Sequence, residues 1–211
     1  VTRSRALMKS ATDAVGNERT VVSKATLYGI AWNSGPGGPE TMVEAIVPAD
    51  LLRRAGIEVA LVSVEPGVVT SSHGVAVQAD LTLGQMNLSK AEMIVLPGGL
   101  AGVRNLEKQS GLGHMIQLAL EQDVWVAAIC AAPTLLAKRG FLKGKAAVCY
   151  PGMEDKLVGA NPRMDQSVVV DGHIITGRAA GAAFDFGLEL VKALAGEEKA
   201  EEVRHAVHYR A

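Results

Sequence analysis

One cysteine occupies the position where a predicted strand ends and a predicted helix begins. Residues 124–129 form a short apolar run, the pattern of a strand buried on both faces. Cys130 follows directly, and residues 131–138 are predicted to be helical because Pro133 fits a first turn, where its missing N–H costs nothing. The N–H groups and partial positive charge at a helix N-terminus stabilise a thiolate. The position therefore suits a nucleophile, although a buried structural cysteine fits the same pattern.

A pair of glycines would supply backbone donors to the same site. Gly98 and Gly99 follow a predicted strand at residues 93–96. Glycine lets the backbone approach a ligand closely and aim its N–H groups at it. The amides of Gly99 and Ala131 would then form an oxyanion hole for a carbonyl group attacked by Cys130, although such glycine pairs are also common in simple turns.

Glu44 is an acidic residue in a stretch that otherwise faces the core. Residues 40–54 carry apolar side chains at helical spacing, among them Met42 and Ile46. Glu44 is then either a partly exposed acid favoured by the helix dipole, or a buried acid that stays protonated. In the second case it would donate a hydrogen bond to the Cys130 thiolate and later move protons.

Strands and helices are predicted to alternate along most of the chain. Strands are expected at residues 24–30, 57–64, 93–96, 124–129 and 145–149, and helices at residues 40–54, 88–92, 110–122, 131–138, 152–158, 181–194 and 197–208. Two antiparallel pairs are expected as well, one within residues 66–83 with a turn near His73, the other formed by residues 167–170 and 173–176. This alternation is typical of an α/β fold, a parallel sheet covered by helices on both sides, with ligands bound beyond the carboxyl ends of the strands.

Composition bounds the fold and the class of partner. The 211 residues, 48% hydrophobic and 20% charged, suffice for one domain with a full core, which we place at residues 24–211. The net charge of −1 argues against stable nucleic-acid binding, and no apolar run is long enough to span a membrane. The two cysteines, Cys130 and Cys149, form no disulfide framework, so a reducing, cytoplasmic location is expected. Residues 1–23, basic at their start, are interpreted as a flexible N-terminal arm, with a chloroplast or mitochondrial transit segment as the alternative.

Three of these features occur in a fixed order: a helical glutamate, a strand followed by Pro-Gly-Gly, and a cysteine elbow. The stretches that carry them, with two further ones near the carboxyl end, are ETMVEAIVPADLLRRAGIEV, VLPGG, VWVAAICAAPTLLA, YPGMEDKL and IITGRAAGAAFDFGLELV. In these stretches the chain resembles the ThiJ/PfpI superfamily and, within it, plant-type members of the DJ-1 group. The resemblance covers about residues 25–194 and favours a nucleophilic Cys130 over a structural one.

The resemblance implies a flavodoxin-like fold with a small β-hairpin, a homodimer, and no metal ion or organic cofactor. It also implies that the Cys130 thiol has a low pKa, is sensitive to oxidation and acts as the nucleophile. Glu44 takes the place of the protonated acid, and Gly99 and Ala131 take the places of the oxyanion-hole amides.

Four more residues fall at substrate-binding positions of that family. Gly98 belongs to the Pro-Gly-Gly loop, and Arg178 matches an arginine near the dimer-facing side of the pocket. His73 falls where many relatives carry an arginine that the partner subunit contributes. Tyr150 replaces a histidine that often precedes the proline, so a Cys-His dyad is not expected. Tyrosine is a poor base at neutral pH but can hydrogen-bond a substrate oxygen.

The activity implied by the resemblance is that of a glyoxalase III, a glutathione-independent lyase. It would convert methylglyoxal to lactate and glyoxal to glycolate through a hemithioacetal on Cys130, while Glu44 moves a proton between the two carbons. Deglycation of proteins and nucleic acids would be a further use of this chemistry. The alternative is a redox-sensing, chaperone-like protein in which Cys130 becomes oxidised. A class I amidotransferase or cysteine peptidase would need a histidine base, and no histidine directly follows a strand next to the elbow.

Overall fold

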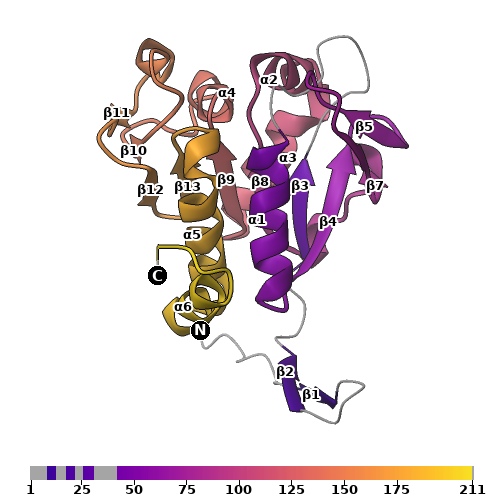
Figure 1. Cartoon of the computed structure of the whole chain (residues 1–211). Coiled ribbons are helices and arrows are strands. Elements are labelled where there is room, and N and C mark those ends of the chain that lie inside the picture. Colours follow the sequence, from indigo (N-terminus) through magenta and orange to yellow (C-terminus); the bar gives the residue numbers. More distant parts are fainter. Residues whose placement is uncertain (1–8, 13–17, 22–25, 31–41, 211) are drawn as a thin grey trace.

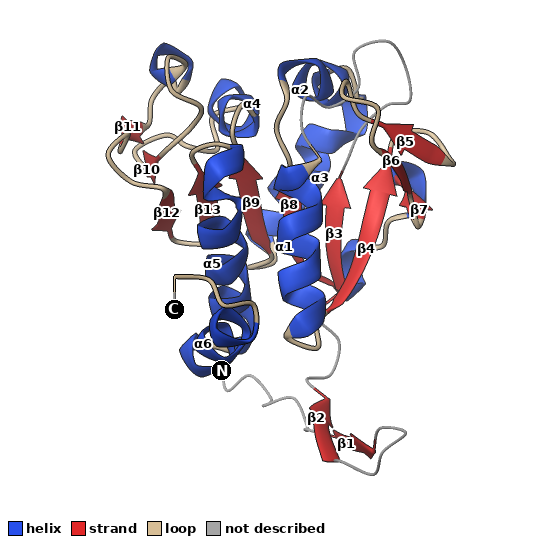
Figure 2. Cartoon of the chain, viewed as in Figure 1, coloured by secondary structure: helices blue, strands red, loops and turns tan. Residues whose placement is uncertain are grey.

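A seven-stranded sheet with helices on both faces forms the body of the protein (Figure 1, Figure 2). The computed structural model describes residues 9–12, 18–21, 26–30 and 42–210. Its strands are β1 (Lys9–Thr12), β2 (Glu18–Val21), β3 (Thr26–Ile30), β4 (Glu58–Ser63), β5 (Val68–Thr70), β6 (Ala76–Gln78), β7 (Leu81–Thr82), β8 (Ala91–Leu96), β9 (Trp125–Ile129), β10 (Ala146–Ala147), β11 (Asn161–Pro162), β12 (Val168–Asp171) and β13 (Ile174–Gly177). Its α-helices are α1 (Val43–Arg54), α2 (Leu100–Glu107), α3 (Ser110–Glu121), α4 (Ala132–Lys138), α5 (Ala183–Ala195) and α6 (Glu197–Ala206).

The order of strands in the main sheet is β12-β13-β9-β8-β3-β4-β7. Every neighbouring pair is parallel except β12 and β13, which form an antiparallel pair at one edge. The opening unit β3–α1–β4 joins two parallel neighbours through a helix, as a βαβ crossover requires. A separate hairpin, β5–β6, stands beside the other edge with His73 in its turn. The predicted flavodoxin-like α/β fold with a small β-hairpin is therefore confirmed.

Alternating side chains along the central strands build one core on each face of the sheet. On β9, Val126 and Ala128 pack with helices α2, α3 and α4, whereas Ala127 and Ile129 pack with α1, α5 and α6. Successive side chains of a strand point to opposite faces, so a strand covered on both faces must be apolar throughout. This constraint explains why the apolar run before Cys130 identifies a central strand.

The sequence pattern misses one helix and overestimates three elements. It does not predict α2, whose buried apolar side chains, Val103 and Leu106, span less than one turn of helical pattern. The strand predicted at residues 145–149 is the two-residue β10, paired with β11 instead of the main sheet. The helices predicted at residues 88–92 and 152–158 are only 3₁₀ turns at Leu88–Lys90 and Glu154–Lys156. Segments this short cannot propagate a helix cooperatively, so they stop after one turn.

The amino-terminal part of the chain bears on two further expectations. Of the proposed arm at residues 1–23, only β1 and β2 are described, and they pair antiparallel with each other in a sheet of their own. The glycine-rich loop after β3 and the first residues of the helix predicted from residue 40 lie outside the described residues. Within the described part of the chain, no helix is both long and apolar enough to cross a bilayer.

Gly187 lets α1 and α5 approach each other closely. A Cβ atom at this position would lie 2.7 Å from Leu51 Cδ1 and 3.0 Å from Pro48 Cα. Neither neighbour yields readily, because Leu51 is 1% exposed and Pro48 is a buried part of α1. The close approach matters for function because α1 also carries Glu44 in its first turn.

Gly187→Ala is expected to lower the free energy of unfolding by about 1–3 kcal/mol, since α1 must shift to admit the methyl group. Thermal denaturation followed by circular dichroism measures the loss. Gly111→Ala in α3 is the matched control, because its added Cβ would meet nothing within 4 Å. That variant should be neutral or slightly stabilised, as alanine favours helices over glycine. Equal losses in the two variants would contradict the close-packing argument.

Candidate active site

Cys130 lies at the carboxyl edge of the sheet, directly after β9. Strands β8 and β9 are parallel neighbours, with Leu96 opposite Ala128. Their ends therefore meet at the same edge, and the loop that holds Gly98 and Gly99 lies next to Cys130. This is the edge at which open α/β sheets bind their ligands.

The backbone at Cys130 forms a strained elbow. Its φ of 65° lies in the left-handed region, which costs a residue other than glycine about 1–3 kcal/mol. Two hydrogen bonds hold this conformation. The Cys130 N–H donates to the Gly177 carbonyl over 2.9 Å, and the Tyr150 N–H donates to the Cys130 carbonyl over 2.8 Å. The strain is thus maintained by neighbours on both sides, as is common for an activated nucleophile.

Glu44 lies fully buried beside this thiol. Its side chain is 0% exposed and comes from the first turn of α1. The Gly98 N–H donates to Glu44 Oε2 over 2.8 Å, and a further hydrogen bond joins the carboxyl group to the Cys130 side chain. The reading of Glu44 as a partly exposed acid at a helix end is therefore wrong. The carboxyl group is instead part of the cysteine's surroundings.

Gly98 has to be a glycine for these two groups to meet. A Cβ atom at this position would lie 2.6 Å from Cys130 Cβ, 2.7 Å from Glu44 Oε2 and 2.8 Å from the Ile129 carbonyl oxygen. All three distances are far below van der Waals contact. Gly98 was expected to bind substrate, and the structure gives it a steric role as well: it makes room for the acid and the thiol.

Two helix N-termini converge on the sulfur. Gly99, with φ of 84°, precedes α2, and Ala131 precedes α4. The backbone N–H groups of both residues form hydrogen bonds with Cys130 that act to lower the pKa of its thiol. The first of these helices, α2, is the one that the sequence pattern does not reveal. The structure thus places both expected oxyanion-hole amides at the nucleophile.

The electrostatics of the thiol depend on its acidic neighbour. Burial, the largest cause, together with repulsion by an ionised Glu44 and their hydrogen bond, raises the pKa of Cys130 to about 12. The amides of Gly99 and Ala131 oppose it. The low pKa implied by the resemblance is therefore not produced while Glu44 is ionised. Since two buried like charges cannot readily coexist, the thiolate forms most easily when Glu44 holds a proton.

Tyr150 and Arg178 are tied to the elbow through the backbone. Tyr150 donates its N–H to Cys130, and its side chain is 49% exposed. Arg178 follows Gly177, is exposed, and donates its N–H to the Ser167 carbonyl over 2.9 Å. Both residues are thus exposed on segments joined to the elbow, and their roles in substrate binding stay predictions.

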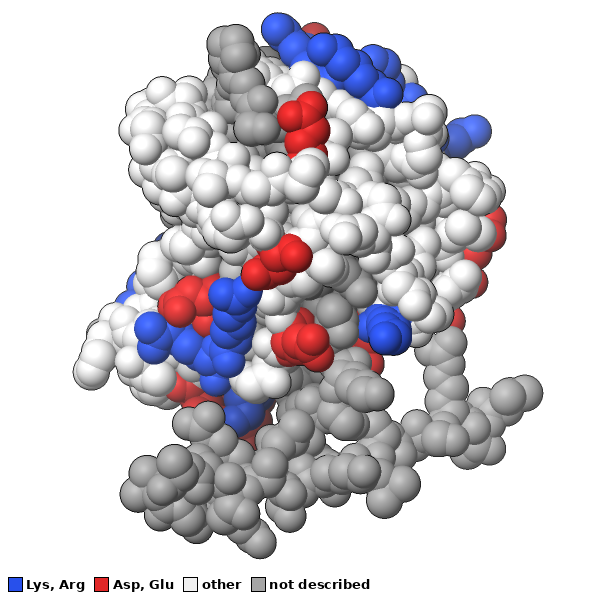
Figure 3. Space-filling model, turned by 90° about the vertical axis from the view of Figure 1, so that its right-hand side faces the viewer, with Lys and Arg blue, Asp and Glu red and all other residues white. Residues whose placement is uncertain are grey.

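His73 lies apart from this group. It is exposed in the β5–β6 turn, with its Nδ1 3.1 Å from Ser72 Oγ. The same hairpin exposes Val68 and Val75, each at 50%. On this side of the molecule, charged side chains lie mainly near the upper edge and in the lower half, with a broad uncharged area between them (Figure 3). A homodimer in which His73 reaches the neighbouring subunit stays a prediction.

The remaining histidines do not approach the elbow as a catalytic base. His173 precedes β13, so it lies at the amino end of that strand, where its ring is 4.9 Å from the ring of Trp125. His114 lies on α3, and His205 and His208 lie on or just after α6. Among the described residues, no three His, Cys, Asp or Glu side chains are grouped so that they would hold a metal ion.

Gly177 is a site residue that sequence reasoning overlooks. Its carbonyl accepts the Cys130 N–H, and a Cβ atom there would lie 2.8 Å from Phe186 Cδ2 and 2.9 Å from Ile129 Cγ1. The available signal is a glycine that ends a predicted strand directly before Arg178. Its importance depends on the pairing of β13 with β9, which local pattern does not specify.

Gly98→Ala is expected to lower the free energy of unfolding by about 1–3 kcal/mol, because the methyl group overlaps the thiol, the acid and the backbone. Urea denaturation measures the loss, with Gly84→Ala as the control, since its added Cβ would have no neighbour within 4 Å. In a Glu44→Ala background the cost of Gly98→Ala should shrink, because one of the overlaps is removed. An unchanged cost there would mean that Glu44 does not occupy this space.

Comparisons with known proteins agree with this arrangement. The family model of the DJ-1/PfpI family matches residues 40–193. The chain is 40% identical to protein dj-1beta of Drosophila melanogaster over 184 residues, 86% of this chain and 95% of that protein. It is 35% identical to a protein of Pyrococcus furiosus named deglycase PfpI over 153 residues, 72% of this chain and 92% of that protein. The crystal structure of Drosophila DJ-1beta superposes with a TM-score of 0.79, at 36% identity, covering 87% of this chain and 97% of that one. The narrower plant-type assignment stays a prediction, but the chain belongs to the DJ-1/PfpI family.

Proposed function

We propose that the protein is a glutathione-independent glyoxalase that converts methylglyoxal to lactate and glyoxal to glycolate. The observation that carries this proposal is the fully buried Glu44, joined by hydrogen bonds to both the Cys130 side chain and the Gly98 amide. The pair supplies a nucleophile and a proton carrier at one place. Two-carbon and three-carbon dicarbonyls need both functions in succession.

The reaction begins with a bond between sulfur and carbon. The Cys130 thiolate attacks the aldehyde carbon of methylglyoxal, and the resulting oxyanion faces the amides of Gly99 and Ala131. The oxyanion then takes up the proton of Glu44, which leaves Glu44 as a carboxylate. The product of this step is a hemithioacetal. Because the reacting aldehyde has a ketone beside it, the hydrogen on the attacked carbon is now acidic.

Glu44 then moves that hydrogen. Its carboxylate removes the proton from the first carbon to give an enediolate, and the carboxylic acid then returns this proton to the second carbon. The hydroxyl proton of the first carbon passes to the oxygen of the second, which leaves a thioester beside a hydroxyl group. The first carbon is oxidised and the second reduced, so no external oxidant or reductant is needed. Water hydrolyses the resulting thioester, which releases lactate and restores the Cys130 thiol.

The protonation state of Glu44 decides whether the first step is feasible. A protonated Glu44 does not repel the thiolate, and it donates a hydrogen bond that favours the charged sulfur. The neutral acid therefore removes the two contributions by which ionised Glu44 raises the pKa of Cys130. We infer that one negative charge is shared by the pair and passes from sulfur to carboxylate during turnover.

Deglycation would be a further use of the same site. Early glyoxal adducts on amines and guanidines carry the same two-carbon unit, and several relatives are named deglycases. Tyr150 and Arg178, both exposed beside the elbow, would hydrogen-bond the oxygens of a larger substrate. Such a substrate must leave most of its bulk outside the site, since Cys130 itself is only 8% exposed.

Lactate formation from methylglyoxal without added glutathione tests the proposal. Cys130→Ala should abolish lactate formation, because no other group forms the hemithioacetal. Glu44→Gln should lower kcat by at least about 100-fold, since the amide cannot move a proton between the carbons. An enzymatic D- or L-lactate assay gives the rates directly.

Cys149→Ala is the matched control for the cysteine. Cys149 is buried at 0% exposure, and its Sγ–H donates to the Tyr150 carbonyl over 3.5 Å, but it is not joined to Glu44. That variant should keep most of the wild-type rate. Lactate formation that survives in Cys130→Ala, or is lost equally in Cys149→Ala, would refute the assigned mechanism.

Titration of the thiol tests the protonation state of Glu44. In a Cys149→Ala background, thiolate absorbance near 240 nm should give wild-type Cys130 a pKa well below about 12. Glu44→Gln should change the pKa of Cys130 by no more than about one unit, because the amide still donates a hydrogen bond to the sulfur. Glu44→Leu should raise this pKa by more, because the side chain at position 44 then donates no hydrogen bond. A wild-type pKa near 12 that falls in Glu44→Gln would instead identify an ionised Glu44.

A redox-sensing role is the competing function, and one feature of the site favours it. The amides of Gly99 and Ala131 and the carboxyl group of Glu44 surround the sulfur with hydrogen-bonding groups, which would also hold the oxygens of a sulfinic acid. If the wild-type protein forms no lactate while mild peroxide adds two oxygen atoms to Cys130, this function replaces the enzymatic one.

A further inference from the structure

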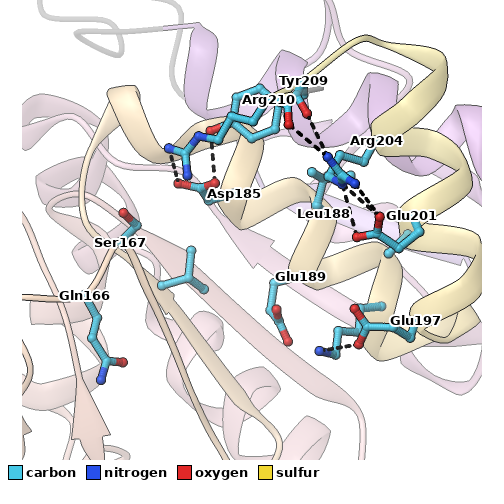
Figure 4. A pocket seen from close by; sticks show the side chains of 13 residues that line it. Gln166, Ser167, Asp185, Leu188, Glu189, Glu197, Glu201, Arg204, Tyr209 and Arg210 are labelled. Carbon is cyan, nitrogen blue, oxygen red and sulfur yellow. Dashed lines mark hydrogen bonds and ion pairs between the residues drawn. The ribbon is translucent and has the colours of Figure 1, made fainter.

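A cavity is lined by residues of helices α5 and α6 and of the segments next to them (Figure 4). Its volume is about 550 Å³, within the range of small-molecule sites. Neither Cys130 nor Glu44 contributes to it. It is lined by Gln166, Ser167, Val168, Asp185, Leu188, Glu189, Lys192, Glu197, Ala200, Glu201, Arg204, Tyr209 and Arg210.

Each positively charged side chain of the cavity wall already has a carboxylate partner. Arg204 pairs with Glu201 over 2.6 Å, and Arg210 pairs with Asp185 over 3.3 Å. Lys192 pairs with Glu197. An anionic ligand would have to break one of these pairs to find a counter-charge, so the cavity is poorly suited to phosphates or carboxylates.

Glu189 is the carboxylate left over from this pairing. The wall carries four acidic and three basic side chains, and no dashed line reaches Glu189 in Figure 4. Its electrostatic neighbour is Lys192, whose own hydrogen bond goes to Glu197. Glu189 is partly buried on α5, where its charge is less screened than on an open surface. The cavity therefore carries one uncompensated negative charge.

The other walls suit a short apolar stem that ends in a polar cation. Val168, Leu188 and Ala200 contribute apolar surface, while Gln166 and Ser167 offer neutral hydrogen-bonding groups. The edge of the cavity formed by Asp185, Tyr209 and Arg210, here called the rim, already holds a guanidinium group. The guanidinium group of Arg210 lies against the Asp185 carboxylate and 5.0 Å from the centre of the Tyr209 ring.

Further contacts hold the rim in place. The Tyr209 hydroxyl donates to Asp185 Oδ1 over 2.9 Å, and the Tyr209 ring stacks on Phe184. Arg204 donates to the carbonyl groups of both Tyr209 and Arg210. Residues 204–210 are thus fixed by contacts within the protein, so this wall of the cavity is preorganised for a ligand.

We propose that this cavity binds a small organic monocation, an ammonium or guanidinium group on a short apolar stem, with Glu189 as its counter-charge. Neither Cys130 nor Glu44 lines the site, and the proposal does not depend on the proposed enzymatic activity. Binding is expected to be modest, because one charge-assisted hydrogen bond and a small apolar contact carry it.

Backbone amide shifts in NMR spectra of the full 211-residue chain test this site. The probes are n-butylguanidinium and n-butylammonium, with n-butanol and butyrate as neutral and anionic counterparts of the same stem. At about 0.15 M salt, both cations should give saturable shifts along α5 and α6, and butanol and butyrate should not. No saturable shift with either cation, or an equal response to butyrate, would overturn the proposal.

Two charge-neutralising variants identify the counter-charge. Glu189→Gln should weaken binding of the cations by about tenfold or more. Glu198→Gln, on α6 but outside the cavity lining, changes the net charge equally and should leave binding unchanged. Equal weakening in both would mean that only overall charge attracts the probes. Cys130→Ala should bind them as wild type does, and a loss there would also contradict a separate site.

Discussion

The contact between a fully buried glutamate and a cysteine thiol is the constraint on which the rest of this structure depends. Glu44 has no solvent to stabilise its charge, and its hydrogen-bond partners are the Gly98 amide and the Cys130 side chain. A buried acid and a buried thiol in contact cannot both ionise at moderate cost. At most one of the two groups is therefore expected to be ionised, and in the proposed mechanism that charge moves between sulfur and oxygen.

The fold brings these two groups together from distant parts of the chain. Glu44 comes from α1, which is fixed against α5 at Gly187, while Cys130 and Gly98 follow neighbouring parallel strands. Parallel strands place their carboxyl ends at one edge, so two helix N-termini also point at the sulfur there. The strained backbone at Cys130 is held by two hydrogen bonds with later segments: its N–H donates to the Gly177 carbonyl, and its carbonyl accepts from the Tyr150 N–H. The site is thus assembled from segments that are far apart in the chain, and no single segment forms it.

Tyr150 stands where the family resemblance implies a histidine in many relatives, so the proposed mechanism assigns proton transfer to Glu44. A neutral phenol does not take up a proton near pH 7, and the histidines of the described chain lie elsewhere. In the proposed mechanism, proton movement among the described residues of the site therefore rests on the Glu44 carboxyl group. A methyl group at Gly98 would overlap both this carboxyl group and the Cys130 side chain.

The sequence by itself determined the α/β alternation, the central strand before Cys130 and the position of Glu44 near the start of a helix. The spacing and polarity of neighbouring residues predict these features, because a strand covered on both faces must be apolar and the first turn of a helix tolerates a proline such as Pro133. It did not determine α2, whose pattern is shorter than the window that periodicity needs, nor the role of Gly177, which depends on strand pairing. Whether Glu44 is buried or exposed, and in which direction the thiol pKa moves, was decided only by tertiary packing. Burial and distance between residues 44 and 130 are properties of the folded chain, and no local pattern encodes them.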